Sequence, residues 1–357
     1  MAPSAAVFAA CICFSQGHLH AGVDVEALKA LSLPKLLETL MATEDHETLG
    51  WVSYALRGKE PESRVELFSR LESQDDFVRV RSARILISWG IVELKTEENK
   101  QLVAVSVGAL SSSDVRARRD AVRALKAHAS WARTFGPKGL LGKEGAVALG
   151  KFLNDEDAMT RQLAAMALAD FGEDARAAEP ALLKAVKAWE GSDRVYAEHA
   201  LSRVDPKVHP LHKSLPVFLK ALKEKSGPED VRIEAIESIR EIGPKAKSAI
   251  PALAACLKDK NDRIVKRICE ALGAVGNGDR LAVRALIELL EDRAKAKTEG
   301  DNKVLLIFVA EALGKQGPAA KDAVIRLKML ANHPMPGLKK AAGEALALIE
   351  AKRSARK

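Results

Sequence analysis

The stretch IGPKAKSAIPALAACLKDKNDRIVKRICEALGAVG, residues 242–276, decides the fold of this chain. It opens on Ile-Gly and closes on Val-Gly, and its two glycine positions, Gly243 and Gly276, lie 33 residues apart. Ahead of the second glycine, Ile264 and Ile268 are separated by about one helical turn, which places both on one face of an α-helix. Polar residues separate this segment from an earlier apolar one. The stretch therefore predicts two helices joined by a turn.

The same pattern recurs along the chain. Aligned on the residue that closes each copy, the segments end at Gly90, Ala129, Gly172, Asp205, Gly243, Gly276, Gly317 and Glu350. From the third copy onward, the spacings are 33, 38, 33, 41 and 33 residues. One helix pair cannot bury its own apolar face, whereas a repeated face lets neighbouring pairs cover one another. The sequence therefore predicts an all-α fold, an α-solenoid of about nine antiparallel helix pairs.

The predicted helices carry matching signals at their ends. Pro244 follows Gly243 directly, and a left-handed glycine followed by proline commonly ends a helix. The first helices of several pairs carry a proline that fits the first turn or a kink, at Pro34, Pro180, Pro216 and Pro251. In the second helices, apolar residues in steps of four, four and three predict the core. These are Val231, Ala235, Ile239 and Ile242 in one copy, and Ile264, Ile268, Leu272 and Val275 in the next.

A helix with Pro-x-Leu, a turn with Asp, and a second helix that opens on Val-Arg and ends on Ala-Leu-x-x-Ile-Gly together resemble the HEAT repeat. The small-residue-rich form is similar to the phycobilisome-lyase HEAT-like type. The resemblance implies antiparallel pairs in a curved solenoid over about residues 33–350, with the second helices on the concave side. The family's turn aspartate matches Asp155. Its second-helix arginine matches Arg79, Arg118, Arg161 and Arg232. Val265 departs from that pattern.

Composition narrows the class of protein further. The chain has 357 residues, of which 47% are apolar and 4% aromatic, a balance that suits closely packed helices. Its net charge is +8, and the last six residues, 352–357, supply four of those charges. No basic stripe interleaved with aromatic residues occurs, which argues against a nucleic-acid partner. The cysteines lie at Cys11, Cys13, Cys256 and Cys269. They show no zinc-binding spacing, so no metal and no cofactor is predicted.

The chain divides into three predicted parts. Residues 1–21 contain an apolar run followed by a polar stretch, which resembles a secretory signal peptide without the usual basic start. That run is too short to span a membrane. We expect either export to the periplasm or the extracellular space with loss of this segment, or a cytoplasmic protein with a disordered N-terminus. Residues 22–351 are predicted to form the solenoid, and residues 352–357 a basic, solvated tail.

One column of the second helices is the candidate site for a partner. Six residues before each closing residue, helical-wheel geometry directs a side chain away from the core. This position, the minus-six column, reads Arg84, Arg123, Met166, His199, Glu237, Glu270, Glu311 and Glu344. Because the column changes from basic to acidic, the C-terminal half of the groove is expected to attract a basic segment of a partner. The alternative is that glutamate serves there as a good helix former on a solvated face.

No catalytic constellation emerges from the sequence. The glycine-rich stretch at 136–145, interpreted as a linker, lacks the spacing of a phosphate-binding loop and has no Ser or Thr after Lys143. A second insertion, at 291–303, is predicted to lengthen the turn inside the eighth pair. The predicted function is a non-catalytic scaffold or adaptor, monomeric, that captures a protein partner along the concave face. The alternatives are a phycobilin-lyase-like or other ligand-binding enzyme using the same groove, and a structural element of a larger complex.

Overall fold

The computed structural model describes residues 24–89, 96–135, 142–224, 227–295 and 301–354. The predicted export segment, residues 1–21, and most of the glycine-rich linker lie outside these ranges. Within them the chain is helical and contains no strand.

The α-helices of the N-terminal half are α1 (Val25–Ala30), α2 (Leu33–Ala42), α3 (His46–Arg57), α4 (Glu62–Ser69), α5 (Asp76–Trp89), α6 (Thr96–Ala109), α7 (Val115–Phe135), α8 (Gly142–Lys151) and α9 (Ala158–Phe171). Those that follow are α10 (Glu179–Ala188), α11 (Gly191–Val204), α12 (Leu215–Lys223), α13 (Glu229–Ile242), α14 (Ile250–Cys256), α15 (Asp262–Val275), α16 (Arg280–Lys295), α17 (Asp301–Gln316), α18 (Val324–Leu330) and α19 (Pro336–Ser354). Short 3₁₀ helices join or extend them at η2 (Arg70–Glu72), η4 (Phe152–Asn154), η5 (Gly172–Ala178), η6 (Leu211–Ser214), η7 (Gly243–Ala249) and η8 (Gly317–Ala323).

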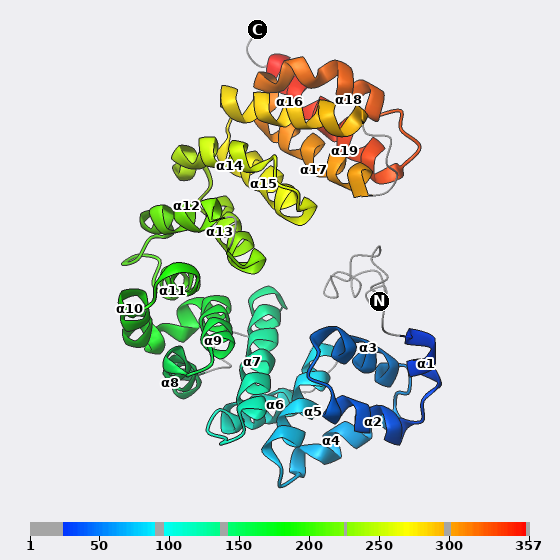
Figure 1. The fold of residues 1–357 in the computed structure, drawn as a ribbon, viewed down its shortest axis with the longest axis vertical. Helices are drawn as coiled ribbons and strands as arrows, with labels where there is room; N and C mark the ends of the chain where they lie inside the picture. Colours follow the sequence, from blue (N-terminus) through cyan, green and yellow to red (C-terminus); the bar gives the residue numbers. More distant parts are fainter. Residues whose placement is uncertain (1–23, 90–95, 136–141, 225–226, 296–300, 355–357) are drawn as a thin grey trace.

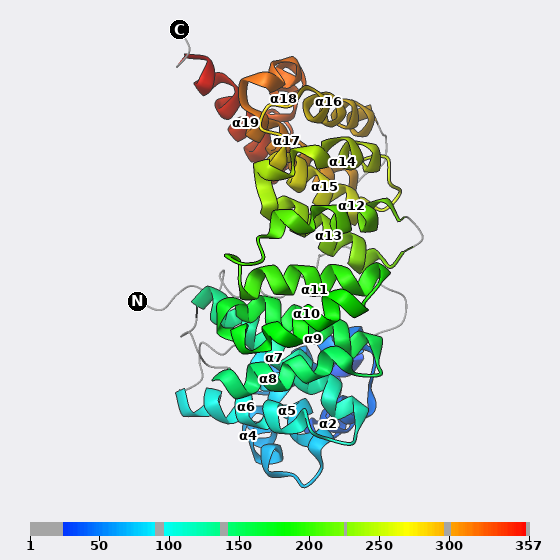
Figure 2. The same ribbon diagram turned by 90° about the vertical axis from the view of Figure 1, so that its left-hand side faces the viewer.

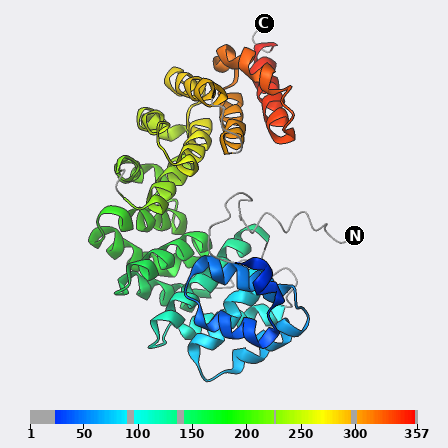
Figure 3. The same ribbon diagram turned by 45° about the vertical axis from the view of Figure 1, so that its right-hand side comes forward.

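From α2 to α19 the described helices form nine consecutive pairs, each with an even-numbered first helix and an odd-numbered second helix. The pairs stack into an arc whose two ends carry the first and last pairs (Figures 1 and 2). From α5 onward, successive second helices pack on one another along the inner side of the arc, and the first helices lie on its outer side (Figures 1 and 3). This arrangement confirms the predicted solenoid.

The helix ends follow the predicted signals in most pairs. Proline occupies the first turn of α2, α10, α12 and α14, where its missing N–H removes no helical hydrogen bond. Gly172, Gly243 and Gly317 end their helices with φ of 58°, 64° and 62°, a region that favours glycine. Gly276 differs, because it keeps a right-handed conformation with φ of −65°. A Cβ atom there would lie 2.5 Å from Oε1 of Gln316, so any other residue would force the Gln316 side chain to move.

The core lies between the helices of successive pairs. Ile239 and Leu272 are completely buried, as the repeat pattern predicts, and Ile242 is half-buried. Cys256 and Cys269 are buried among apolar neighbours, and burial raises the pKa of the Cys269 thiol. The buried apolar residues form two clusters that meet at α5 and α7. One extends from α2 to the middle of α7, and the other extends from α5 to α19. These two cysteines therefore serve as small hydrophobic side chains.

The last pair presents a more polar outer side than the pairs before it. Val265 and Cys269 on α15 are buried, whereas the corresponding residues of α19 are the exposed Lys339 and Gly343. No atom outside its own helix lies within 4 Å of a Cβ atom built on Gly343. This side of α19 is therefore more polar and more exposed than the matching side of α15.

Two segments, residues 291–303 and the described start of the predicted tail, are more helical than the sequence predicts. The stretch at 291–303 was expected to be a lengthened turn, but α16 continues to Lys295 and α17 begins at Asp301. Likewise, α19 continues through Ser354, so the described part of the predicted tail is helical. Both segments contain residues of good helix propensity, such as Ala, Lys, Glu and Arg, and they extend helices that are already formed.

Candidate functional site

The minus-six column lies on the second helices, along the inner side of the arc. Its members do not share one environment. Arg84, Arg123, Met166, His199, Glu237 and Glu270 are half-buried, whereas Glu311 and Glu344 are exposed. Three of the charged members, Arg84, His199 and Glu237, form ion pairs with a neighbouring second helix. The column is therefore part of the contact between pairs as well as part of the inner surface.

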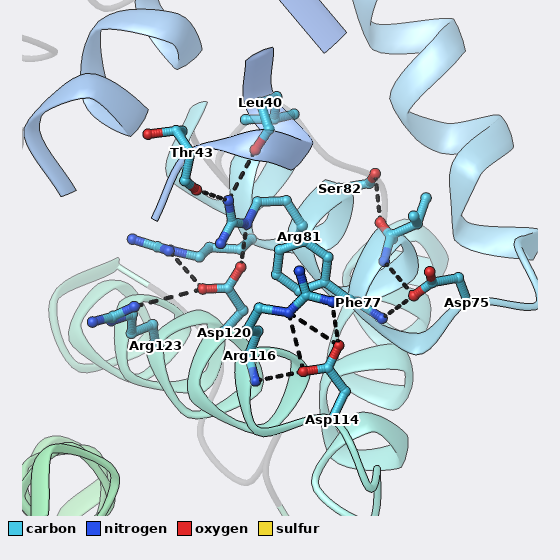
Figure 4. Close-up of polar contacts among 12 residues, drawn as sticks. Leu40, Thr43, Asp75, Phe77, Arg81, Ser82, Asp114, Arg116, Asp120 and Arg123 are labelled. Carbon is cyan, nitrogen blue, oxygen red and sulfur yellow. Dashed lines mark hydrogen bonds and ion pairs between the residues drawn. The ribbon is translucent and has the colours of Figure 1, made fainter. Parts of the chain in front are cut away.

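At the N-terminal end, three arginines surround one buried carboxylate. We call Arg81, Arg84, Asp120 and Arg123 the arginine cluster, and Figure 4 labels Arg81, Asp120 and Arg123. Arg84 donates through Nη1 to Oδ1 of Asp120 at 2.7 Å, and Arg123 Nη1 lies 3.7 Å from the same oxygen. Arg81 donates to the other oxygen, Oδ2. The Asp120 side chain is 1% exposed, and the Arg81 and Arg84 side chains are 4% and 11% exposed.

Arg81 also links the first pair to the cluster. Its Nη1 donates to the carbonyl oxygens of Leu40 at 2.8 Å and Thr43 at 2.6 Å, at the C-terminal end of α2. A cation at a helix C-terminus is stabilised by the unpaired carbonyls and the helix dipole. The planar guanidinium additionally stacks on Phe77, with 4.4 Å from Cζ to the ring centroid. Arg81 therefore connects α2, α5 and α7, and its bonding capacity is largely used.

A second cluster joins α11 to α13 around His199. Its Nδ1 contacts Oε1 of Glu234, and its Nε2 lies 3.3 Å from Oε2 of Glu241. Arg203 donates to the other Glu241 oxygen at 2.8 Å. Burial alone lowers the pKa of His199, but the hydrogen bonds and charges of Glu234 and Glu241 outweigh it and raise that pKa to about 9. The imidazole is therefore positively charged at neutral pH.

A third cluster joins α13 to α15, and its column residues carry the opposite charge to those of the first. Two column glutamates, Glu237 and Glu270, each lie 3.0 Å from Nη1 of Arg267. Arg240 donates to Glu237 at 2.7 Å. The Arg267 side chain is 39% exposed, so solvent screens this cluster far more than the arginine cluster.

The remaining members of the column lie outside these clusters. Met166 packs against the apolar core. Glu311 is exposed on α17, and Glu344 on α19 lies 3.9 Å from Lys340 across an exposed ion pair. The most accessible acidic positions of the column are thus its last two.

The partners of the column form a second column that the sequence interpretation missed. Nine residues before each closing residue stand Arg81, Asp120, Leu163, Tyr196, Glu234, Arg267, Phe308 and Ala341. A minus-six residue contacts the minus-nine residue of the next pair in Arg84–Asp120, His199–Glu234 and Glu237–Arg267. Residues three apart share a helical face, so the opposite charges of the two columns were a readable signal.

The arginines that match the HEAT pattern lie near the turn that precedes each second helix, not in the minus-six column. Arg118 approaches Asp155 at 3.4 Å, Arg161 approaches Asp193 at 3.1 Å, and each pair bridges two repeats. Arg232 similarly donates to Asp259 at 2.6 Å. A surface hollow of about 450 Å³ lies beside Arg118 and Asp155, and another of about 400 Å³ lies beside Leu211 and Pro244. Arg118, Arg161 and Arg232 therefore stabilise the stacking of pairs, whereas Arg79 pairs with Asp76 of its own helix.

In the ranges that the structure describes, no group of three or more His, Cys, Asp or Glu side chains is arranged to hold a metal ion. Within the same ranges, no helix combines the length and the apolar character needed to cross a bilayer.

Comparisons with known proteins agree with the repeat organisation. A family model described as HEAT repeats matches residues 215–301, which span α12 to the start of α17. No curated protein matches the chain. Among solved structures, the Escherichia coli protein YibA is 17% identical, with 84% of this chain and 99% of that chain covered and a TM-score of 0.47.

Two engineered structures are also similar. A designed armadillo repeat protein is 17% identical over 68% of this chain and 98% of its own, with a TM-score of 0.39. Another engineered protein is 20% identical over 89% of this chain and 98% of its own, with a TM-score of 0.36.

Proposed function

We propose that this protein is a non-catalytic scaffold that binds a protein partner along the inner face of its solenoid. The observation that carries the proposal is the inner face itself, where successive second helices present charged side chains in register along the arc. A row of charges at a fixed spacing can set the position of an extended partner, and stacked repeats supply the long surface.

The charges are suited to selecting a partner's orientation. The N-terminal part of the inner face carries the arginine cluster, and the C-terminal part carries the exposed Glu311 and Glu344. A partner with an acidic segment and a basic segment would bind in one direction, because the reverse direction would place like charges together. We propose that the protein is a monomer in solution, because a partner can reach the inner face only if no second copy covers it.

The alternative is an enzyme of the phycobilisome-lyase HEAT-like type, which would hold a chromophore or other ligand in the same groove. Such an enzyme needs an enclosed site, since drug-sized ligands are largely buried in clefts. The two hollows described above lie beside turn residues and helix ends, not along the minus-six column. We therefore favour the scaffold.

The test is a capture experiment with charge-reversed proteins. The full chain, a Glu311→Lys and Glu344→Lys variant, and a Glu66→Lys and Glu288→Lys variant would be used to capture partners from native lysate. Mass spectrometry would identify the partners. Both variants change the net charge equally, but the second pair of residues lies on the outer helices α4 and α16.

The scaffold proposal expects a partner that the wild type and the outer variant retain and the inner variant loses. Equal capture by all three proteins would contradict binding at this part of the inner face. Colour or a bound small molecule in the purified protein would instead favour the ligand-binding enzyme.

A further inference from the structure

The arginine cluster contains more positive charge than its surroundings balance. Three guanidinium groups face one carboxylate, that of Asp120, within the described residues around it. Arg81 also donates to the carbonyls of Leu40 and Thr43, whereas Arg84 and Arg123 have only Asp120 as a partner among the described residues. Partly buried like charges repel one another strongly because the surrounding dielectric is low. The cluster therefore favours an additional anion.

The titration of Arg84 agrees with this geometry. Its pKa is lowered from the ordinary value, chiefly by burial, and the nearby charges of Arg123 and Arg81 lower it further against the opposing effect of Asp120. A second negative group beside Arg84 and Arg123 would relieve this repulsion. Such a group would interact more strongly there than on an open surface.

Both arginines have donors to offer. Among the described residues, Arg84 uses Nη1 for Asp120, and Arg123 approaches Asp120 only at 3.7 Å, beyond hydrogen-bond distance. A guanidinium carries five N–H donors in a planar fork that matches the two oxygens of a carboxylate. Arg123 is 25% exposed, so a ligand can reach its fork from the inner face.

We propose that Arg84 and Arg123 bind a carboxylate of an acidic peptide segment in the partner, held between α5 and α7. This inference rests on the proposed scaffold function and specifies the chemistry of one end of its partner. Asp120 is then a positioning residue, because it holds the two guanidinium groups side by side without touching the ligand.

A peptide suits the site better than single-stranded nucleic acid. Nucleic-acid sites combine basic residues with aromatic faces on which bases stack. The aromatic ring beside this cluster, Phe77, is covered by Arg81 and Arg116, each with its guanidinium carbon 4.4 Å from the ring centroid. Phe77 therefore has no free face on which a base could stack. Arginine contacts to phosphate groups alone would not distinguish a nucleic acid from any other polyanion.

The test uses the full chain and a fluorescein-labelled octaglutamate peptide as the probe, with binding followed by fluorescence anisotropy. Arg123→Gln removes the accessible fork, and Arg123→Lys retains the charge but loses the planar geometry. Arg284→Gln is the matched control, because Arg284 also pairs with a carboxylate, that of Glu288, but on the outer helix α16. Circular dichroism would establish that all variants are folded.

We expect Arg123→Gln to weaken octaglutamate binding about tenfold, the effect of losing one hydrogen bond to a charged group. Arg123→Lys should weaken it less, and Arg284→Gln should leave it unchanged. No binding by the wild type, or equal weakening by Arg123→Gln and Arg284→Gln, would overturn the proposal. Tighter, Arg123-dependent binding of a labelled octauridylate would overturn it in favour of nucleic acid.

This assay and the capture experiment fail independently. Octaglutamate binding requires no native partner, so a positive result with unchanged capture would leave the carboxylate site and remove the scaffold proposal at the acidic end. If the Glu311 and Glu344 variant loses the partner but the wild type does not bind octaglutamate, the scaffold proposal stands and the carboxylate site is removed.

Discussion

The arginine cluster and the cluster around Arg267 occupy the same columns of the repeat with inverted charge. In the first, two column arginines share the carboxylate of Asp120; in the second, two column glutamates share the guanidinium of Arg267. Their burial differs widely, since the Asp120 side chain is 1% exposed and that of Arg267 is 39% exposed. The same position in a repeat can therefore hold a structural ion network in one pair and a solvated one in another.

The two regions also differ in charge balance. Arg240 joins the Arg267 cluster, so two glutamates there face two arginines. The arginine cluster has no second carboxylate among the described residues around it. A balanced, exposed cluster contributes little to stability and attracts a partner weakly, whereas an unbalanced, buried one is sensitive to both mutation and anions.

The largest effect should come from the apolar core on which both clusters depend. Leu272 is completely buried between α15 and its neighbours. Leu272→Asp removes that packing and buries an unpaired charge, so we expect a loss of at least about 5 kcal/mol in the free energy of unfolding and local unfolding of adjacent pairs. Urea denaturation followed by circular dichroism would measure it. The control, Arg263→Asp at an exposed position of the same helix, should change stability by only about 1 kcal/mol. Similar values for both variants would show that the register is wrong.

Next in size is the loss of the carboxylate from the arginine cluster. Asp120→Asn preserves the shape of the side chain but leaves Arg81 and Arg84 buried without their counter-charge. We expect a loss of about 3–5 kcal/mol in the free energy of unfolding. Glu97→Gln is the matched control, because it removes one carboxylate from an exposed pair with Lys100 and should change stability by at most about 1 kcal/mol. An equally small effect of Asp120→Asn would mean that solvent reaches the cluster.

The sequence predicted the features that each repeat determines by itself. Residue spacing predicts the complete burial of Ile239 and Leu272. Local backbone preferences predict the first-turn proline of α14 and the left-handed Gly243. Nine pairs could be counted because this pattern returns in each copy. Helix boundaries were less predictable, as the continuation of α16 to Lys295 shows.

The candidate site was harder to predict because its contacts join different repeats. The column position of Arg84 and Glu237 was found, but exposure was judged from a single helix. Their partners, Asp120 and Arg267, come from the next pair, and a one-helix projection contains no information about them. Reading the minus-six and minus-nine columns together would have paired the charges. The degree of burial would still have required the structure.

The stability of the junction between α11 and α13 is expected to depend on pH, because this junction, unlike the two clusters compared above, contains a histidine. Its helices contact one another less extensively than the other successive second helices from α5 onward, and His199 with Glu234 and Glu241 joins them. The folded-state pKa of His199, about 9, exceeds its unfolded value of about 6.5. Its contribution is therefore fully present below about pH 6.5 and is lost as the pH rises through about 9.

We expect the free energy of unfolding to fall by about 2–3 kcal/mol through this group between those pH values, as linkage requires. Urea denaturation of the wild type and of His199→Gln across this range would isolate the contribution of the imidazole. The variant should be less stable at pH 6.5 and should lack this dependence. Parallel curves for the two proteins would assign the pH effect to other groups.

The smallest effect, and the one that most directly sharpens the comparison, is expected at Arg267. Arg267→Gln removes the cation shared by Glu237 and Glu270, yet Arg240 still pairs with Glu237 and water reaches the cluster. We expect a loss of about 1 kcal/mol or less in the free energy of unfolding, which added salt should reduce further.

Combining Glu237→Gln with Arg267→Gln tests whether that exposed pair acts as a unit. The coupling energy from this double-mutant cycle should be about 0.5 kcal/mol or less, whereas the cycle of Arg84→Gln with Asp120→Asn should give a larger value because both groups are buried. Equal coupling in the two cycles would remove burial as the distinction between the clusters. With the expected difference, the Arg267 cluster is free to exchange its internal ion pairs for contacts with a partner, because breaking them costs the fold little.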